Sequence, residues 1–130
     1  MPRRQKSFAC LVVKNAGSTL VQKRQTCRTM NVILDLCIVP IGVGVSLSSY
    51  VAACEKVLAE AGLKTALHAN GTNIEGEWDK VFAAVRRCHE VVHEMGAPRI
   101  FTVMKVGTRT DRIQTMDEKT QSVANKLASL

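Results

Sequence analysis

The stretch of sequence that decides the fold runs over residues 68–79 and reads HANGTNIEGEWD. Two strand-like segments, residues 64–70 and residues 72–75, meet within it at the pair Asn70-Gly71. This pair favours a tight hairpin turn because both residues adopt positive φ angles at low cost. The sequence therefore predicts a β-hairpin at the centre of the chain.

A helix is predicted directly after this hairpin. Gly76 is expected to end the second strand, and Glu77 and Asp79 place negative charge where a helix N-terminus favours it. Apolar residues and one histidine then recur at helical spacing; they are Val81, Phe82, Val85, Cys88, His89 and Val92. The pattern leaves Glu75 as a carboxylate on a strand beside a turn.

Further elements are predicted on both sides of this centre. Residues 32–39 form an apolar run interrupted only by Asp35, which is typical of a buried strand. Ser48 is expected to cap the helix that follows. Residues 99–106 again have the pattern of a strand that is apolar on both faces, and a Thr-x-x-Glu capping box at Thr115 opens a last helix.

The predicted order is β-α-β-β-α-β with an extra C-terminal helix, an α+β pattern of the ferredoxin-like type. It occupies residues 30–130 as one domain. Both main helices would cover one face of the sheet, yet the first strand carries apolar residues on both of its faces. A monomer would thus expose an apolar patch, and a second copy of the chain is the expected partner.

The positive charge of the chain is concentrated in its first residues. The net charge is +7, and residues 1–29 contain seven basic residues and no acid. We expect this segment to lie outside the fold as a disordered extension, so that a chain starting at Met30 folds unaided. A mitochondrial transit peptide, a true start at Met30 and a basic arm for nucleic acid are all open alternatives.

The cysteines indicate a reducing compartment. There are five, widely spaced and mostly within apolar segments, which argues against a disulfide framework or a zinc site. We therefore expect a cytoplasmic protein, or a mitochondrial one if residues 1–29 are a transit peptide. The sequence has no apolar run long enough to predict a membrane partner. Residues 30–130 are neutral overall, so they do not predict nucleic-acid binding.

Three groups of residues have both a functional and a structural interpretation. His89 and His93 lie four residues apart and could ligate a metal, but core or interface histidines fit better. Arg109 lies in a loop with a second arginine and an aspartate; it could grip an anion, or form an ion pair that only shapes the loop. Trp78 could stack on a ligand ring or anchor the core.

Four sequence blocks resemble a known family. They are residues 39–42 (VPIG), 46–51 (SLSSYV), 71–76 (GTNIEG) and 105–111 (KVGTRTD). Together and in this order, they resemble the small thiamine-binding protein family, from about residue 31 to the end of the chain. The family pattern has a threonine where this chain has Val43, so a hydroxyl contact made there by relatives would be missing.

The resemblance implies a ferredoxin-like subunit that forms a homotetramer, a dimer of dimers, and binds thiamine or a related aminopyrimidine without catalysis. It implies no metal and no cofactor other than thiamine as the ligand. The residues expected to bind the ligand are Thr72, Asn73, Glu75, Trp78, Ser46 and Arg109. Strand alternation turns Thr72 away from Asn73 and Glu75, so the two sets can share one ligand only if the hairpin twists or a second subunit closes the site.

Glu75 is the expected centre of such a site. A carboxylate pairs well with an aminopyrimidine ring, and nothing about its strand position requires an acid for stability. The expected function is that of a carrier or intracellular buffer. Two alternatives are a metal-dependent or acid/base enzyme built on His68, His89 and Glu75, and a purely structural oligomer; no nucleophile with a positioned base is visible to support the enzyme.

Overall fold

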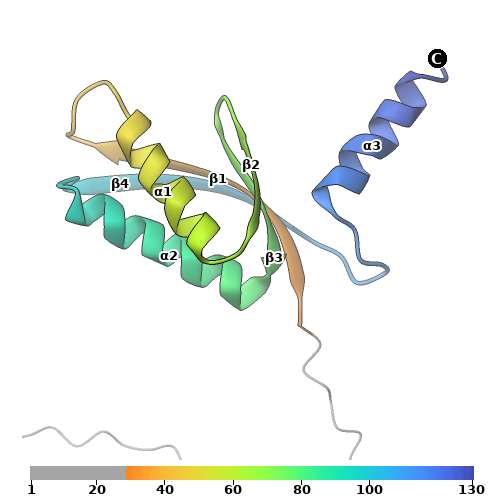
Figure 1. Ribbon diagram of the computed structural model, residues 1–130, viewed down its shortest axis with the longest axis horizontal. Coiled ribbons are helices and arrows are strands. Elements are labelled where there is room, and N and C mark those ends of the chain that lie inside the picture. Colours follow the sequence, from red (N-terminus) through yellow and green to blue (C-terminus); the bar gives the residue numbers. More distant parts are fainter. Residues whose placement is uncertain (1–28) are drawn as a thin grey trace, which may run out of the picture.

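The computed structural model describes residues 29–130 (Figure 1). Its elements are β1 (Asn31–Ile41), α1 (Ser48–Glu60), β2 (Lys64–His68), β3 (Gly71–Glu77), α2 (Trp78–Glu94), β4 (Arg99–Thr108) and α3 (Met116–Leu127). The element order predicted from the sequence is confirmed. The predictions made for residues 1–28 lie outside the described residues. None of the helices in residues 29–130 is long and apolar enough to cross a membrane.

The four strands form one antiparallel sheet in the order β2-β3-β1-β4. Helices α1 and α2 pack side by side on one face of it (Figure 1). Residues Val32, Leu34 and Leu36 of β1 are buried beneath these helices, whereas their neighbours in the strand alternate to the other side. We call the side not covered by α1 and α2 the outer face.

The core lies between the helices and the sheet. Its fully buried side chains come from every layer of the domain: Leu34, Leu58, Ile74, Val32, Val81, Val92 and Cys88. The helical spacing predicted for α2 is confirmed, because Val81, Val85, Cys88 and Val92 are all buried. Burying such a set removes enough apolar surface from water to stabilise a single small domain.

The hairpin forms, but its turn is one residue earlier than predicted. The two turn residues are Ala69 and Asn70, because His68 pairs with Gly71 across the end of the hairpin. Neither has a positive φ angle, and neither does Gly71. A Cβ atom on Gly71 would lie 2.6 Å from the carbonyl oxygen of Leu36. The glycine is therefore required by close approach to β1 and not by the turn.

The expectation that Gly76 ends the strand is also wrong. Strand β3 continues through Gly76 to Glu77, whose side chain caps α2 by accepting from the backbone N–H groups of Asp79 and Lys80. A Cβ atom on Gly76 would lie 2.8 Å from a methyl carbon of Leu63. The same Cβ would lie 3.1 Å from a methyl carbon of Val81, so the missing side chain lets α2 pack close to β3.

The two predicted helix caps have opposite outcomes. Helix α1 begins at Ser48 itself, after Leu47, and has no side-chain cap, so the prediction of Ser48 as the capping residue is wrong. The capping box of α3 is confirmed: the Thr115 hydroxyl accepts from the N–H of Glu118, and the Glu118 carboxylate accepts from the N–H of Thr115.

Helix α3 is attached to the rest of the molecule at its first turn. Met116 is the buried residue of this helix, whereas Val123 and Leu127 are 58% and 64% exposed. Figure 1 shows the helix projecting away from the sheet. Beyond its first turn, α3 therefore leaves its apolar side chains largely exposed in residues 29–130.

Candidate functional site

A cleft of about 910 Å³ lies beside Glu75, where β1 begins and β4 ends. The start of β1, the edge of the hairpin and the loop that leads from β4 to α3 form its walls. Its charged and polar lining residues are Thr29, Asn31, Lys64, Glu75, Thr108, Arg109, Thr110, Arg112, Gln114, Thr115 and Lys119. The volume falls within the range of about 300–1,000 Å³ that small-molecule sites occupy. We call this the Glu75 cleft.

Glu75 lies on the outer face of β3, with its side chain 20% exposed. Its Oε2 atom accepts a hydrogen bond of 2.6 Å from the backbone N–H of Met116, the first residue of α3. Its Oε1 atom lies 3.8 Å from Nζ of Lys64, which is longer than a hydrogen bond. Glu75 therefore makes a contact to α3 that the sequence did not predict, and one of its oxygens retains a free acceptor site.

Lys64 is the cross-strand neighbour of Glu75 and joins it to α3. Its ammonium donates a hydrogen bond of 2.5 Å to Asp117, and this contact raises the pKa of Lys64. Sequence reasoning missed Lys64, because the predicted turn at Asn70-Gly71 would place Ala66 opposite Glu75, whereas the observed register pairs Lys64 with Glu75. Lys64 and Glu75 thus hold the first turn of α3 at the edge of the cleft.

Arg109 reaches the same cleft but is engaged within its own loop. Its guanidinium donates to both carboxylate oxygens of Asp111 and, at 2.6 Å, to the side-chain oxygen of Gln114. The contact with Arg109 lowers the pKa of Asp111 to about 2. The loop-shaping interpretation of the Arg–Asp pair is the one that this geometry matches.

Of the predicted ligand-binding residues, Thr72 and Asn73 lie on opposite faces of β3. Thr72 is buried under the helices and donates a hydrogen bond of 2.5 Å to the Glu55 carboxylate on α1. Asn73 lies on the outer face between Asp35 of β1 and Ala66 of β2. The alternation foreseen from the sequence is confirmed, and within one chain Thr72 is directed away from the Glu75 cleft.

Trp78 and Ser46 are not among the residues that line the cleft. Trp78 is the first residue of α2 and packs on Phe82, with their ring centroids 4.5 Å apart, which matches its interpretation as a core anchor. Ser46 lies in the loop after β1, whereas the cleft lies at the start of that strand. Because β1 has 11 residues, the two ends are roughly 30 Å apart at about 3.3 Å per residue.

The histidines of α2 make structural contacts. Nε2 of His89 lies 2.8 Å from the Thr102 hydroxyl of β4, and burial lowers the pKa of His89, with a smaller effect from His93. Nδ1 of His93 donates to the carbonyl of Ala97 at the end of the helix. His89 thus lies on the helix side of the sheet, across from His68 and Glu75. Residues 29–130 contain no cluster of His, Cys, Asp and Glu that could hold a metal ion.

A polar cluster occupies the outer face next to the hairpin. Nε2 of His68 lies 2.8 Å from Oδ1 of Asp35, and Nζ of Lys105 lies 3.5 Å from the other oxygen of this carboxylate. The backbone N–H of Asn70 donates to Nδ1 of His68, so the two contacts fit an imidazole with its proton on Nε2. Asp35, the lone acid in its apolar strand, was the sequence signal for this cluster.

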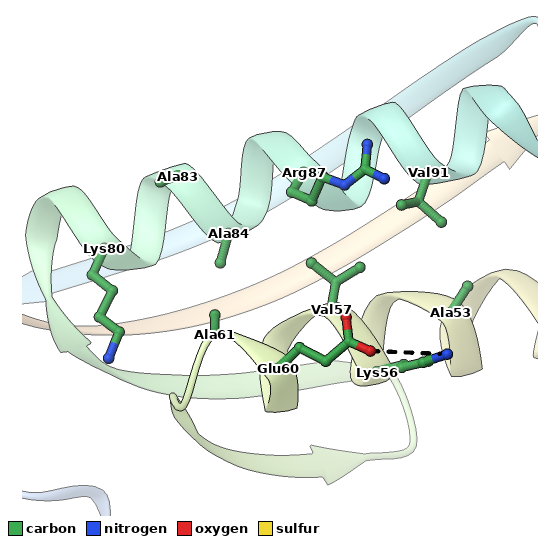
Figure 2. Close-up of a pocket in the computed structure, with 10 residues that line it drawn as sticks. All are labelled: Ala53, Lys56, Val57, Glu60, Ala61, Lys80, Ala83, Ala84, Arg87 and Val91. Carbon is green, nitrogen blue, oxygen red and sulfur yellow. Dashed lines mark ion pairs between the residues drawn. The ribbon is translucent and has the colours of Figure 1, made fainter.

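A second concave surface is present on the helix side. A groove of about 760 Å³ lies between α1 and α2. Figure 2 shows alanine and valine side chains from both helices at its centre. Lys56, Glu60, Lys80 and Arg87 lie along it, and Lys56 pairs with Glu60 at 3.8 Å. None of the residues predicted to bind a ligand lines this groove, so we place the candidate site at the Glu75 cleft.

Comparisons with known proteins give a consistent result. A family model described as thiamine-binding protein matches residues 34–124. A UPF0045 protein of Synechocystis is 71% identical over 96 residues, which cover 74% of this chain and 79% of the relative. A UPF0045 protein of Eremothecium gossypii is 43% identical over 100 residues, which cover 76% of this chain and 95% of the relative. None of these names states an enzymatic activity.

Solved structures share the fold. Protein MJ1052 of Methanocaldococcus jannaschii is 29% identical with a TM-score of 0.68, covering 72% of this chain and 96% of its own. A Thermotoga maritima protein, described as a candidate for thiamine biosynthesis or salvage, is 17% identical with a TM-score of 0.62, covering 72% and 98%; this likeness concerns the fold alone. By the family model and the sequence identities, the chain belongs to the thiamine-binding protein family, which includes the UPF0045 proteins.

Proposed function

We propose that this protein binds thiamine or a related aminopyrimidine in the Glu75 cleft without converting it, as a carrier or intracellular buffer. The observation that carries the proposal is a carboxylate in a cleft of ligand size, in a chain of the thiamine-binding family. Asn73 lies two residues from Glu75 on the same face and could bond a ligand that extends along the strand.

The geometry of Glu75 supports this role. Thiamine carries a permanent positive charge on its thiazolium ring and an amino group on its pyrimidine ring. Oε2 of Glu75 is occupied by the N–H of Met116, but Oε1 makes no hydrogen bond in residues 29–130. Oε1 is therefore free to accept from an amino or protonated ring nitrogen of the ligand, a charge-assisted bond that is stronger than a neutral one.

We further propose that the protein acts as a homo-oligomer of ferredoxin-like subunits, a dimer of dimers that associate through their sheets. Phe101 and Val103 on the outer face are 57% and 46% exposed, which supports a partner over this side. Because Ser46 and the Glu75 cleft of its own chain lie at opposite ends of β1, Ser46 would reach a ligand only from another copy.

Calorimetric titration of the purified protein with thiamine and with the free aminopyrimidine tests the proposal. The substitution Glu75→Gln keeps an oxygen to accept from Met116 but removes the charge that would bind the ligand. We expect affinity to fall by about 1.5–3 kcal/mol, the range for a hydrogen bond to a charged group. Thermal stability without ligand should change little.

The matched control is Glu60→Gln, since Glu60 is an exposed glutamate that lines the groove between α1 and α2 (Figure 2). It should leave affinity unchanged. If Glu60→Gln weakens binding instead, the ligand site is the helix groove. If wild-type protein binds neither compound, the proposal fails and a purely structural oligomer becomes the better interpretation.

A further inference from the structure

We propose that Arg112 and Lys119 form an anion subsite in the Glu75 cleft, and that the preferred ligand is a phosphate ester of thiamine rather than the free vitamin. This inference rests on the proposed function and adds the chemical class of the ligand. It follows from the charges that line the cleft and from the partners that already neutralise some of them.

Four cationic side chains line the cleft, against one carboxylate. The cations are Lys64, Arg109, Arg112 and Lys119, and the acid is Glu75. Free thiamine carries only positive charge, so these cationic side chains would repel it. The addition of phosphate groups makes the ligand a net anion while keeping the rings that Glu75 would recognise.

Two of the four cations are neutralised within the molecule. Lys64 lies between Glu75 and Asp117, with its hydrogen bond to Asp117. Arg109 donates to both oxygens of Asp111. Neither side chain could contact a ligand phosphate without leaving a carboxylate partner, so neither is assigned to the subsite.

Arg112 and Lys119 have no such partners. Neither takes part in any ion pair among residues 29–130. A guanidinium matches two oxygens of a phosphate at once, and an ammonium adds a compact point charge. The hydroxyl-bearing residues Thr108 and Thr110 line the same cleft and add neutral donors of the kind that phosphate oxygens accept.

The nearby acids do not cancel this charge. Asp111 is paired with Arg109, Asp117 with Lys64, and the Glu118 carboxylate accepts from the backbone of Thr115. None of the three is among the residues that line the cleft. The uncompensated charge of the cleft is therefore positive. It lies on Arg112, in the loop after β4, and on Lys119, near the start of α3.

The test is calorimetry at low ionic strength with thiamine, thiamine monophosphate and thiamine diphosphate. We expect the diphosphate to bind wild-type protein at least about tenfold more tightly than thiamine, an effect typical of charge-assisted hydrogen bonds. The double variant R112Q/K119Q should lose this preference, because the diphosphate loses the two side chains that would bind its phosphate groups. The matched control R86Q/K126Q removes the same two residue types on helix surfaces outside the cleft and should keep the preference.

The outcomes separate this inference from the proposed function. If thiamine binds and phosphorylation adds no affinity, the anion subsite is wrong while the proposed function stands. If both double variants lose the preference equally, overall charge rather than the two residues causes it, and the subsite is again wrong. If none of the three compounds binds wild-type protein, the proposed function fails and the subsite with it.

Discussion

Gly71 shapes the outer face by having no side chain. It pairs with His68 on β2, and a Cβ atom at this position would lie 3.1 Å from Oδ1 of Asp35 on β1. The His68 ring reaches across β3 to that same oxygen. One absent methyl group thus permits both the close strand packing and the hydrogen bond that links β2 to β1.

Gly71→Ala should destabilise the protein by about 1–3 kcal/mol, the cost of forcing an extra methyl group into a packed site. The atom it would meet first is a backbone oxygen of Leu36, which cannot rotate away. Gly107→Ala is the control, because its Cβ would make an ordinary contact of 3.7 Å with a backbone oxygen of Ile33. Urea unfolding of both variants measures the difference, and equal stabilities would contradict the argument.

Asp35 should make stability depend on pH. The hydrogen bond from His68 lowers the pKa of this carboxyl below its ordinary value, and Lys105 adds to the effect. A carboxyl whose pKa is lower in the folded state stabilises the fold above its unfolded pKa of about 4, and this contribution is lost as the pH falls through the folded pKa.

The substitution Asp35→Asn should therefore cost up to about 1 kcal/mol near pH 7, the usual limit for a partly exposed pair. It should cost less as the pH falls below the ordinary carboxyl pKa of about 4 and through the lowered folded-state pKa, where the wild-type carboxyl protonates. Unfolding free energies of both proteins across this range provide the measurement. A cost that stays constant with pH would show that the charge of Asp35 contributes nothing.

At the scale of elements, local sequence patterns predicted which helices and strands form, and tertiary contacts determined the residues at which they end. The hairpin, the stripe of α2 and the capping box of α3 follow from short-range periodicity and hydrogen bonding. The turn shifted by one residue because Gly71 was needed against Leu36, and β3 ran through Gly76 because α2 packs there. Neither neighbour lies close enough in sequence to be seen in the local pattern.

The candidate site was only partly predictable for the same reason. Glu75 and Gly107, which leads into the Arg109 loop, are brought together because both pair with Ile33, from opposite sides of β1. The order of strands in a sheet depends on pairing between segments that lie far apart in the sequence. The local sequence patterns therefore could not show that this loop and the hairpin share a cleft. The separation of Thr72 from Glu75 was predictable, since it needs only alternation along one strand.

Helix α3 should owe its order to its cap. Thr115→Ala removes a capping bond worth about 1 kcal/mol, so amide exchange in α3 should speed up by roughly fivefold. Thr120→Ala is the control in the same helix, since its hydroxyl bonds only to carbonyls of the preceding turn and alanine is the better helix former. Exchange measured by mass spectrometry should change in α3 and stay constant in α2; equal effects of the two variants would contradict the role of the cap.

At the scale of the whole molecule, the outer face is divided in two. One half carries the polar cluster of Asp35, His68 and Lys105, which lie on β1, β2 and β4. The half toward the end of β1 carries apolar side chains, with Cys37 paired to Val103 and Val39 to Phe101. An apolar half bordered by charge has the composition of an interface with a polar rim.

Phe101→Asp should convert the proposed oligomer to a smaller species, because it would place a charge in the apolar half of the outer face. Val45→Asp is the control, since Val45 is fully exposed in the loop after β1. Light scattering coupled to size-exclusion chromatography measures the mass of each. A wild-type monomer, or a Phe101→Asp protein that keeps the wild-type mass, would contradict association through this face.

The two borders of the sheet also differ, and the difference limits how copies could add to one another. Strand β2 is an edge strand of five residues that includes Lys64 and His68. Short, charged edge strands do not readily pair with a strand of another chain. Strand β4 offers ten residues at the opposite border. Only the β4 edge is long enough to pair with a strand of another chain. Two chains that paired through their β4 strands would therefore each have no further edge available for pairing. Such addition would stop at a pair and could not propagate into a fibre.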